Sequence, residues 1–147
     1  MQLADEAKKL WPLLDGKAAG SVILVGHSFG GALALHMART RPELFKAVLV
    51  FEPVAFHLFK STDPALSQQV QQLSQQMLNV SAKDAAELFI DYWQGDEYFN
   101  HLPDVMQQKL TAQVGKVAAD FEALSGEPAT LIDYATACLL YTSDAAD

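Results

Sequence analysis

The chain has 147 residues, of which 50% are hydrophobic and 19% are charged, a balance that excludes an intrinsically disordered or collagen-like protein. Eighteen Asp and Glu against ten Lys and Arg give a net charge of −8, and no basic cluster is present, so nucleic acid is not an expected partner. The apolar stretches are far shorter than the ~20 residues that cross a bilayer, so no membrane partner is expected either.

The first 57 residues contain the pattern of a βαβ unit preceded by a helix. Apolar residues at helical spacing predict an amphipathic helix over 3–14. Residues 21–25 and 47–51 are short apolar runs without polar alternation, which is typical of parallel strands buried on both faces. The nearly all-apolar segment 32–38 between them predicts a helix. Two strands joined by one helix predict a parallel sheet with a right-handed crossover.

A purely helical pattern follows the second strand. Asp63 before Pro64 is typical of a helix start, and Ser81 with Asp84 three residues later resembles a capping box. Apolar stripes at helical spacing continue the pattern to about residue 126. The sequence therefore predicts an α/β part followed by several helices.

The last ten residues, 138–147, do not resemble natural protein sequence. Their letters, CLLYTSDAAD, resemble the translation of a sequencing adapter, so we expect a non-native tail that plays no part in the fold. A short polar tail is the alternative. The sequence thus predicts four parts: a partial α/β core at 1–57, a helical cap at 58–131, a return toward the core at 132–137, and the tail at 138–147.

One motif carries chemistry, Gly26-His27-Ser28-Phe29-Gly30. It follows a predicted strand and precedes a predicted helix, the context in which G-x-S-x-G forms a sharp turn that strains the serine backbone and lifts its oxygen above the sheet edge. The two glycines are expected to permit a close backbone approach that a side chain would block. The helix directs its first N–H groups toward a reacting carbonyl, so the Phe29 N–H is expected to stabilise an oxyanion. An ordinary serine in a Gly-rich turn is the alternative.

This motif, the Ala/Leu-rich helix after it and the stretch AVLVFEP at 47–53 resemble the α/β-hydrolase superfamily at its fifth strand, nucleophile helix and sixth strand. The stretch EPVAFH at 52–57 is further similar to bacterial hydrolases with a small helical cap. The resemblance implies Ser28 as the nucleophile of a Ser–acid–His triad. In that family the acid and the histidine follow two later strands, and a second oxyanion donor precedes the nucleophile. We therefore expect an incomplete fragment that is inactive by itself.

Three further residues are candidates for binding substrate. His27 and Glu52 follow the predicted strands at the edge where open α/β sheets bind ligands, and in some relatives an acid near Glu52 serves the triad. Trp93 belongs to an aromatic group in the helical part that could cover an apolar substrate. A structural role is the alternative for each. No residue spacing is typical of a metal site or a phosphate-binding loop, so we expect no metal and no cofactor.

The sequence favours a hydrolase that cleaves an ester or similar acyl bond of a small molecule through an acyl-enzyme on Ser28. A cofactor-free haloperoxidase-type enzyme and a carbon–carbon bond hydrolase use the same turn, whereas dehalogenases and epoxide hydrolases carry aspartate at this position. A receptor-like protein that binds a hydrophobic ligand is the alternative from another class. A cytoplasmic location is expected, because no leader pattern is recognisable and the single cysteine demands no oxidising compartment. The sequence predicts no oligomeric state.

Overall fold

The computed structural model describes residues 2–135, and these residues form two compact units. Unit 1 contains residues 2–62 and 123–135, and unit 2 contains residues 63–122. The predicted non-native tail at 138–147 lies outside the described residues, as do residues 136–137 of the predicted return. The two units are described separately below.

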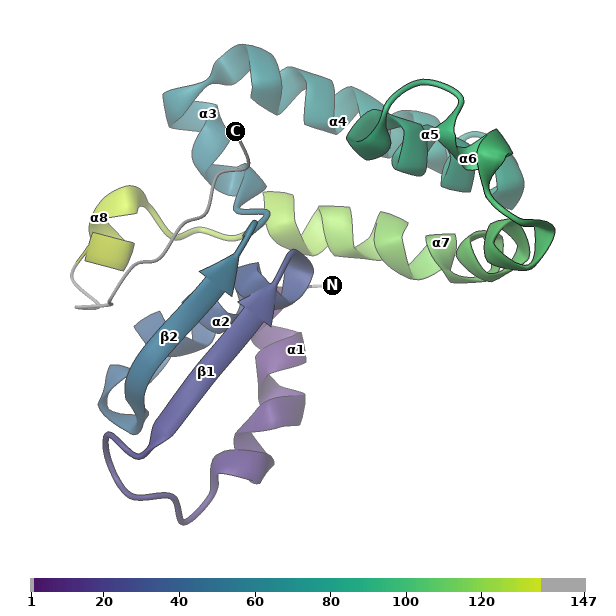
Figure 1. Cartoon of the computed structure of the whole chain (residues 1–147). Helices are drawn as coiled ribbons and strands as arrows, with labels where there is room; N and C mark the ends of the chain where they lie inside the picture. Colours follow the sequence, from purple (N-terminus) through teal and green to yellow (C-terminus); the bar gives the residue numbers. More distant parts are fainter. Residues whose placement is uncertain (1, 136–147) are drawn as a thin grey trace. The chain divides into compact units, whose positions relative to one another are not determined.

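Unit 1 is built around a βαβ element (Figure 1). Helix α1 (Leu3–Leu10) and a 3-10 turn (Trp11–Leu14) lead to β1 (Val22–His27), α2 (Phe29–Thr40) and β2 (Phe45–Phe51). The two strands pair in parallel, with Val25 opposite Leu49 and His27 opposite Phe51. The predicted parallel βαβ unit is confirmed. Each strand extends two residues beyond its predicted range at one end, because pairing with its neighbour includes Gly26 and His27 in β1 and Phe45 and Lys46 in β2.

The two faces of this sheet differ in their exposure. Helix α2 packs against both strands and α1 packs against α2, so these helices cover one face (Figure 1). Ala34 and Ala38 of α2 and Val48 and Val50 of β2 form the buried core there. On the other face the apolar side chains are exposed, and Val25 is the extreme case at 74%. The strands thus have the composition of strands buried on both faces, and within the described part of the chain one of these faces is covered.

The last described part of the chain also belongs to unit 1. After β2 the chain forms a 3-10 turn (Phe56–Leu58) and α3 (Phe59–Thr62), and it returns with the end of α7 (Asp104–Ser125) and with α8 (Leu131–Ala135). Ala129 and Tyr134 are buried in the same core as α2 and β2. Residues far apart in the sequence therefore complete this core.

Unit 2 consists of helices. They are α4 (Pro64–Leu78), α5 (Ala82–Gln94), α6 (Tyr98–His101) and the greater part of α7. Two predicted helix starts are confirmed, because the Leu66 N–H donates to the Asp63 carboxylate at 3.0 Å and the Asp84 N–H donates to the Ser81 hydroxyl at 3.2 Å. None of the helices within residues 2–135 combines the length and the apolar character that a membrane span needs.

Candidate active site

Ser28 occupies the sharp turn between β1 and α2. Its backbone has φ 52° and ψ −123°, a region that a residue with a Cβ rarely adopts and that costs about 1–3 kcal/mol. The Ser28 N–H donates to the Phe51 carbonyl at 3.0 Å, and the Ser28 carbonyl accepts from the N–H groups of Gly31 and Ala32. These bonds attach the turn to β2 on one side and to α2 on the other. The strained conformation is therefore held by regular structure on both sides.

The glycines around Ser28 have different roles. A Cβ on Gly26 would lie 2.3 Å from the Gly30 carbonyl oxygen, so no side chain fits there. A Cβ on Gly31 would lie 3.1 Å from two carbons of Pro53, which follows β2. A Cβ on Gly30 would meet nothing within 4 Å. The expectation of two close approaches is thus correct for Gly26 and wrong for Gly30, because Gly30 turns its carbonyl rather than its Cα hydrogens toward β1, and Gly31 makes the second approach.

Helix α2 begins directly after Ser28, with Phe29 as its first residue. The following two turns are buried from Gly31 to Ala38, so the helix has little freedom to move against the sheet. The N-terminus of such a helix carries a partial positive charge and directs N–H groups outward, which favours a developing anion. The position of Phe29 is the one that an oxyanion donor next to Ser28 requires, and its role stays a prediction.

His27 and Glu52 come together at the carboxyl ends of the two strands. Nε2 of His27 lies 3.3 Å from Oε2 of Glu52, and both side chains are more than half exposed. Glu52 also has a positive φ of 46°. Two of the three predicted substrate-binding residues therefore lie together beside Ser28, at the edge where ligands of open α/β sheets bind.

Trp93, the third predicted substrate-binding residue, belongs to unit 2. It lies on α5, is 46% exposed and contacts Tyr92 edge to face at 5.0 Å between ring centroids. This exposed pair differs from Phe99, which is completely buried in unit 2. The contact of Trp93 with substrate stays a prediction.

All four histidines of the chain have partners other than Ser28 in the described residues. His27 bonds to Glu52, and His36 bonds to Glu127. The remaining two contacts are Nε2 of His57 with the Tyr134 hydroxyl and Nδ1 of His101 with the Glu97 carbonyl. Within residues 2–135, no histidine is hydrogen-bonded to the Ser28 hydroxyl as a general base would be.

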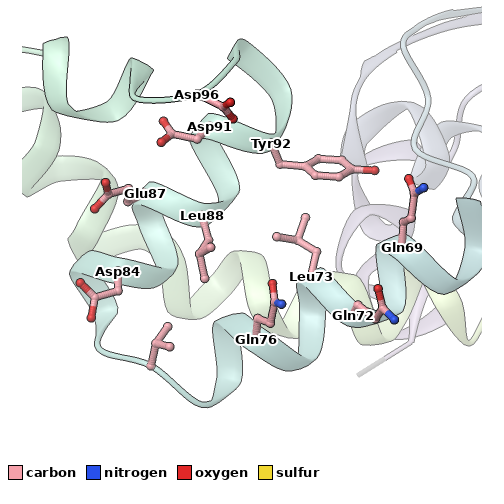
Figure 2. A pocket seen from close by; sticks show the side chains of 11 residues that line it. Gln69, Gln72, Leu73, Gln76, Asp84, Glu87, Leu88, Asp91, Tyr92 and Asp96 are labelled. Carbon is pink, nitrogen blue, oxygen red and sulfur yellow. The ribbon is translucent and has the colours of Figure 1, made fainter.

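Unit 2 contains a groove of about 720 Å³ between α4 and α5 (Figure 2). Glutamines of α4 line one side and carboxylates of α5 the other. The Asp84 carboxylate accepts from the hydroxyl of Ser81, the N-cap residue of α5. Glu87 accepts from the Asn100 amide, and Asp91 accepts the N–H groups of Glu97 and Phe99. These carboxylates stabilise the local helix ends and turns. Across residues 2–135, no group of three or more His, Cys, Asp or Glu is arranged to hold a metal ion.

Glu127 is a buried charged residue that the sequence analysis did not single out. Its side chain is 2% exposed and accepts from Nδ1 of His36 at 2.8 Å and from Nη2 of Arg39 at 3.1 Å. Burial alone would raise the pKa of this carboxyl, but the hydrogen bond from His36 and the nearby positive charges outweigh it and lower the pKa. The carboxylate is thus ionised at neutral pH. Its place between Gly126 and Pro128 has no periodicity that could have revealed this burial.

Comparison with known proteins identifies the family of this chain. Residues 2–125 match the family described as the alpha/beta hydrolase fold, so the chain belongs to the α/β-hydrolase family. Among curated proteins the chain is similar to Lipase LipV of Mycobacterium tuberculosis, with 49% identity over 41 residues. Those residues are 28% of this chain and 16% of the lipase, so the match spans a small part of that relative. No solved structure matches the chain.

Proposed function

We propose that this chain carries the nucleophile of a serine hydrolase that cleaves an ester or a similar acyl bond of a small molecule. The strained backbone of Ser28 supports the proposal most directly, because a φ of 52° is sustained there by bonds to β2 and α2. Such strain is typical of a reactive residue held in position. The similarity to a protein named a lipase favours an ester as the substrate.

In the proposed reaction the Ser28 hydroxyl attacks the substrate carbonyl and passes its proton to a histidine. The tetrahedral oxyanion accepts from the Phe29 N–H, a bond worth about 3 kcal/mol in the transition state. Its collapse releases the alcohol, which takes the proton from the histidine, and leaves an acyl group on Ser28. Water activated by the same histidine then releases the acid. The histidine and its acidic partner are proposed to come from outside residues 2–135, with His27 and Glu52 contacting the substrate.

The proposal is tested by labelling the full-length protein that contains this chain with a fluorophosphonate probe. The expected result is a single label on the Ser28 peptide in mass spectrometry, absent in Ser28→Ala and retained in Ser61→Ala, which replaces another serine of unit 1. Hydrolysis of a p-nitrophenyl ester should be lost with the label. A folded full-length protein that takes no label, or takes it at another serine, would support the receptor-like alternative and overturn the proposal. Burst release of p-nitrophenol by the 147-residue chain alone would contradict the proposal that the general-base histidine comes from outside residues 2–135.

A further inference from the structure

Unit 1 contains a buried charged cluster that the proposed acyl transfer does not use. We call it the Glu127 cluster, and it comprises Glu127, His36, Arg39 and the Ala129 N–H. One oxygen of the carboxylate accepts from His36, and the other accepts from Arg39 and from Ala129 at 3.2 Å. His36 and Arg39 are three residues apart and so lie on one side of α2. The cluster therefore joins α2 to the segment between α7 and α8.

Apolar contacts also attach this segment to unit 1. Ala129 and Tyr134 are buried in the core, but Leu131 is 54% exposed and Ile132 is 75% exposed. The Tyr134 ring therefore anchors the end of the segment in the core, whereas the neighbouring Leu131 and Ile132 side chains contribute little to its attachment. The charged contacts of Glu127 attach the start of the segment to α2.

A second buried contact lies in the same part of unit 1. The Tyr134 hydroxyl hydrogen-bonds to Nε2 of His57 at 3.0 Å, and both residues are buried. His57 precedes the residues of unit 2 in the sequence, and Tyr134 follows them. The contact therefore links the segment of unit 1 that precedes unit 2 in the sequence with the segment that follows it.

We propose that Glu127 is a positioning residue that fixes residues 126–135 to α2 and thereby holds the two connections of unit 2 together within unit 1. The helix that receives this attachment is the one that begins at Ser28. His36 lies eight residues after Ser28, roughly 12 Å along the helix axis. Glu127 therefore acts on the turn only through α2. The attachment itself does not depend on the proposed hydrolase activity.

The attachment is tested by hydrogen exchange of the full-length protein at neutral pH. Glu127→Gln keeps the shape of the side chain and removes its charge, and Glu43→Gln removes a carboxylate from an exposed pair with Arg41 in the same unit. We expect about tenfold or faster exchange in residues 126–135 for Glu127→Gln, since local opening governs exchange there. No change is expected for Glu43→Gln, and Glu127→Asp should restore part of the protection.

Two results would overturn the proposal. One is unchanged exchange in 126–135 when Glu127 is neutral, and the other is an acceleration in 126–135 that is smaller than in the rest of unit 1, which would place the effect of the substitution elsewhere. If Glu127→Gln does not fold, Arg39→Gln removes one donor of the same carboxylate and is judged by the same pattern. A fluorophosphonate experiment separates the two proposals. We expect slower labelling of Ser28 in Glu127→Gln, whereas a wild-type protein that takes no label contradicts the hydrolase and leaves the exchange result to decide the attachment.

Discussion

The main-chain N–H of Ser28 donates to the carbonyl of Phe51, which joins the turn after β1 to the last residue of β2 at 3.0 Å. A residue with positive φ lies on each side of this bond, Ser28 at 52° and Glu52 at 46°. Each strand is thus followed directly by a residue with positive φ, at the same edge of the sheet. Because strain of this kind persists only where the surrounding structure sustains it, this edge is where we expect function.

The strain at Ser28 predicts an unusual order of stability. Ser28→Gly should raise the free energy of unfolding by about 1 kcal/mol relative to Ser28→Ala, since glycine adopts positive φ without a Cβ clash. Both variants remove the nucleophile and should take no label. Chemical denaturation of the two full-length variants measures the difference. Equal stabilities would mean that the turn relaxes to an ordinary conformation when the hydroxyl is removed.

The different surroundings of Gly26 and Gly30 predict different costs of the same substitution. Gly26→Ala forces a Cβ against the Gly30 carbonyl and should lower the free energy of unfolding by about 3 kcal/mol, with loss of Ser28 labelling. Gly30→Ala has open space and should cost less than about 0.5 kcal/mol. Thermal unfolding of both full-length variants provides the comparison. An equal cost at the two positions would show that the close approach at Gly26 is not maintained.

The exposed pair of His27 and Glu52 predicts an effect on binding rather than on stability. Glu52→Gln should change the free energy of unfolding by less than about 1 kcal/mol, because ion pairs exposed to water contribute little. If the pair contacts substrate, KM for an ester should rise severalfold while kcat changes little. Steady-state kinetics of the full-length variant distinguishes the two parameters. A loss of kcat with unchanged KM would instead place Glu52 in the triad.

Local patterns in the sequence predicted the elements that position Ser28. They did not predict the features that depend on contacts between residues far apart in the sequence. The apolar runs and the G-x-S-x-G spacing predicted β1, α2 and β2, because each depends on neighbours in the chain. The buried Glu127 side chain bonds to His36, which is 91 residues away in the sequence, and no periodic pattern predicts a contact over such a separation. Gly30 and Gly31 are adjacent and alike in sequence, so only the position of Pro53 shows which one must lack a side chain.

The loss of the Glu127 charge predicts a large effect on stability. Glu127→Gln removes the buried carboxylate that His36 and the partly exposed Arg39 share, and it should cost about 3 kcal/mol at pH 7. Since the pKa of Glu127 is lowered on folding, its contribution is present above the ordinary pKa of 4.5 and declines as pH falls through the lowered value. The difference between wild type and variant should therefore shrink in acid. Denaturation at several pH values measures it, and a difference that is constant with pH would contradict an ionised carboxylate.

The burial of His57 predicts a second pH dependence at higher pH. Burial lowers the pKa of His57 below its ordinary value of 6.5. The negative charge of Glu127 raises this pKa, but the positive charges of Lys60 and Arg39 lower it further, and the net shift is downward. The unfolded chain then binds a proton more readily than the folded one, so the free energy of unfolding should fall as pH drops below about 6.5. His57→Gln keeps a polar partner for Tyr134 and does not titrate, so it should remove this dependence of the unfolding free energy on pH. The separate loss of stability at lower pH, where carboxylates become protonated, should remain. Urea denaturation of both full-length proteins between pH 5 and pH 7 tests the assignment, and equal slopes would show that another group is responsible.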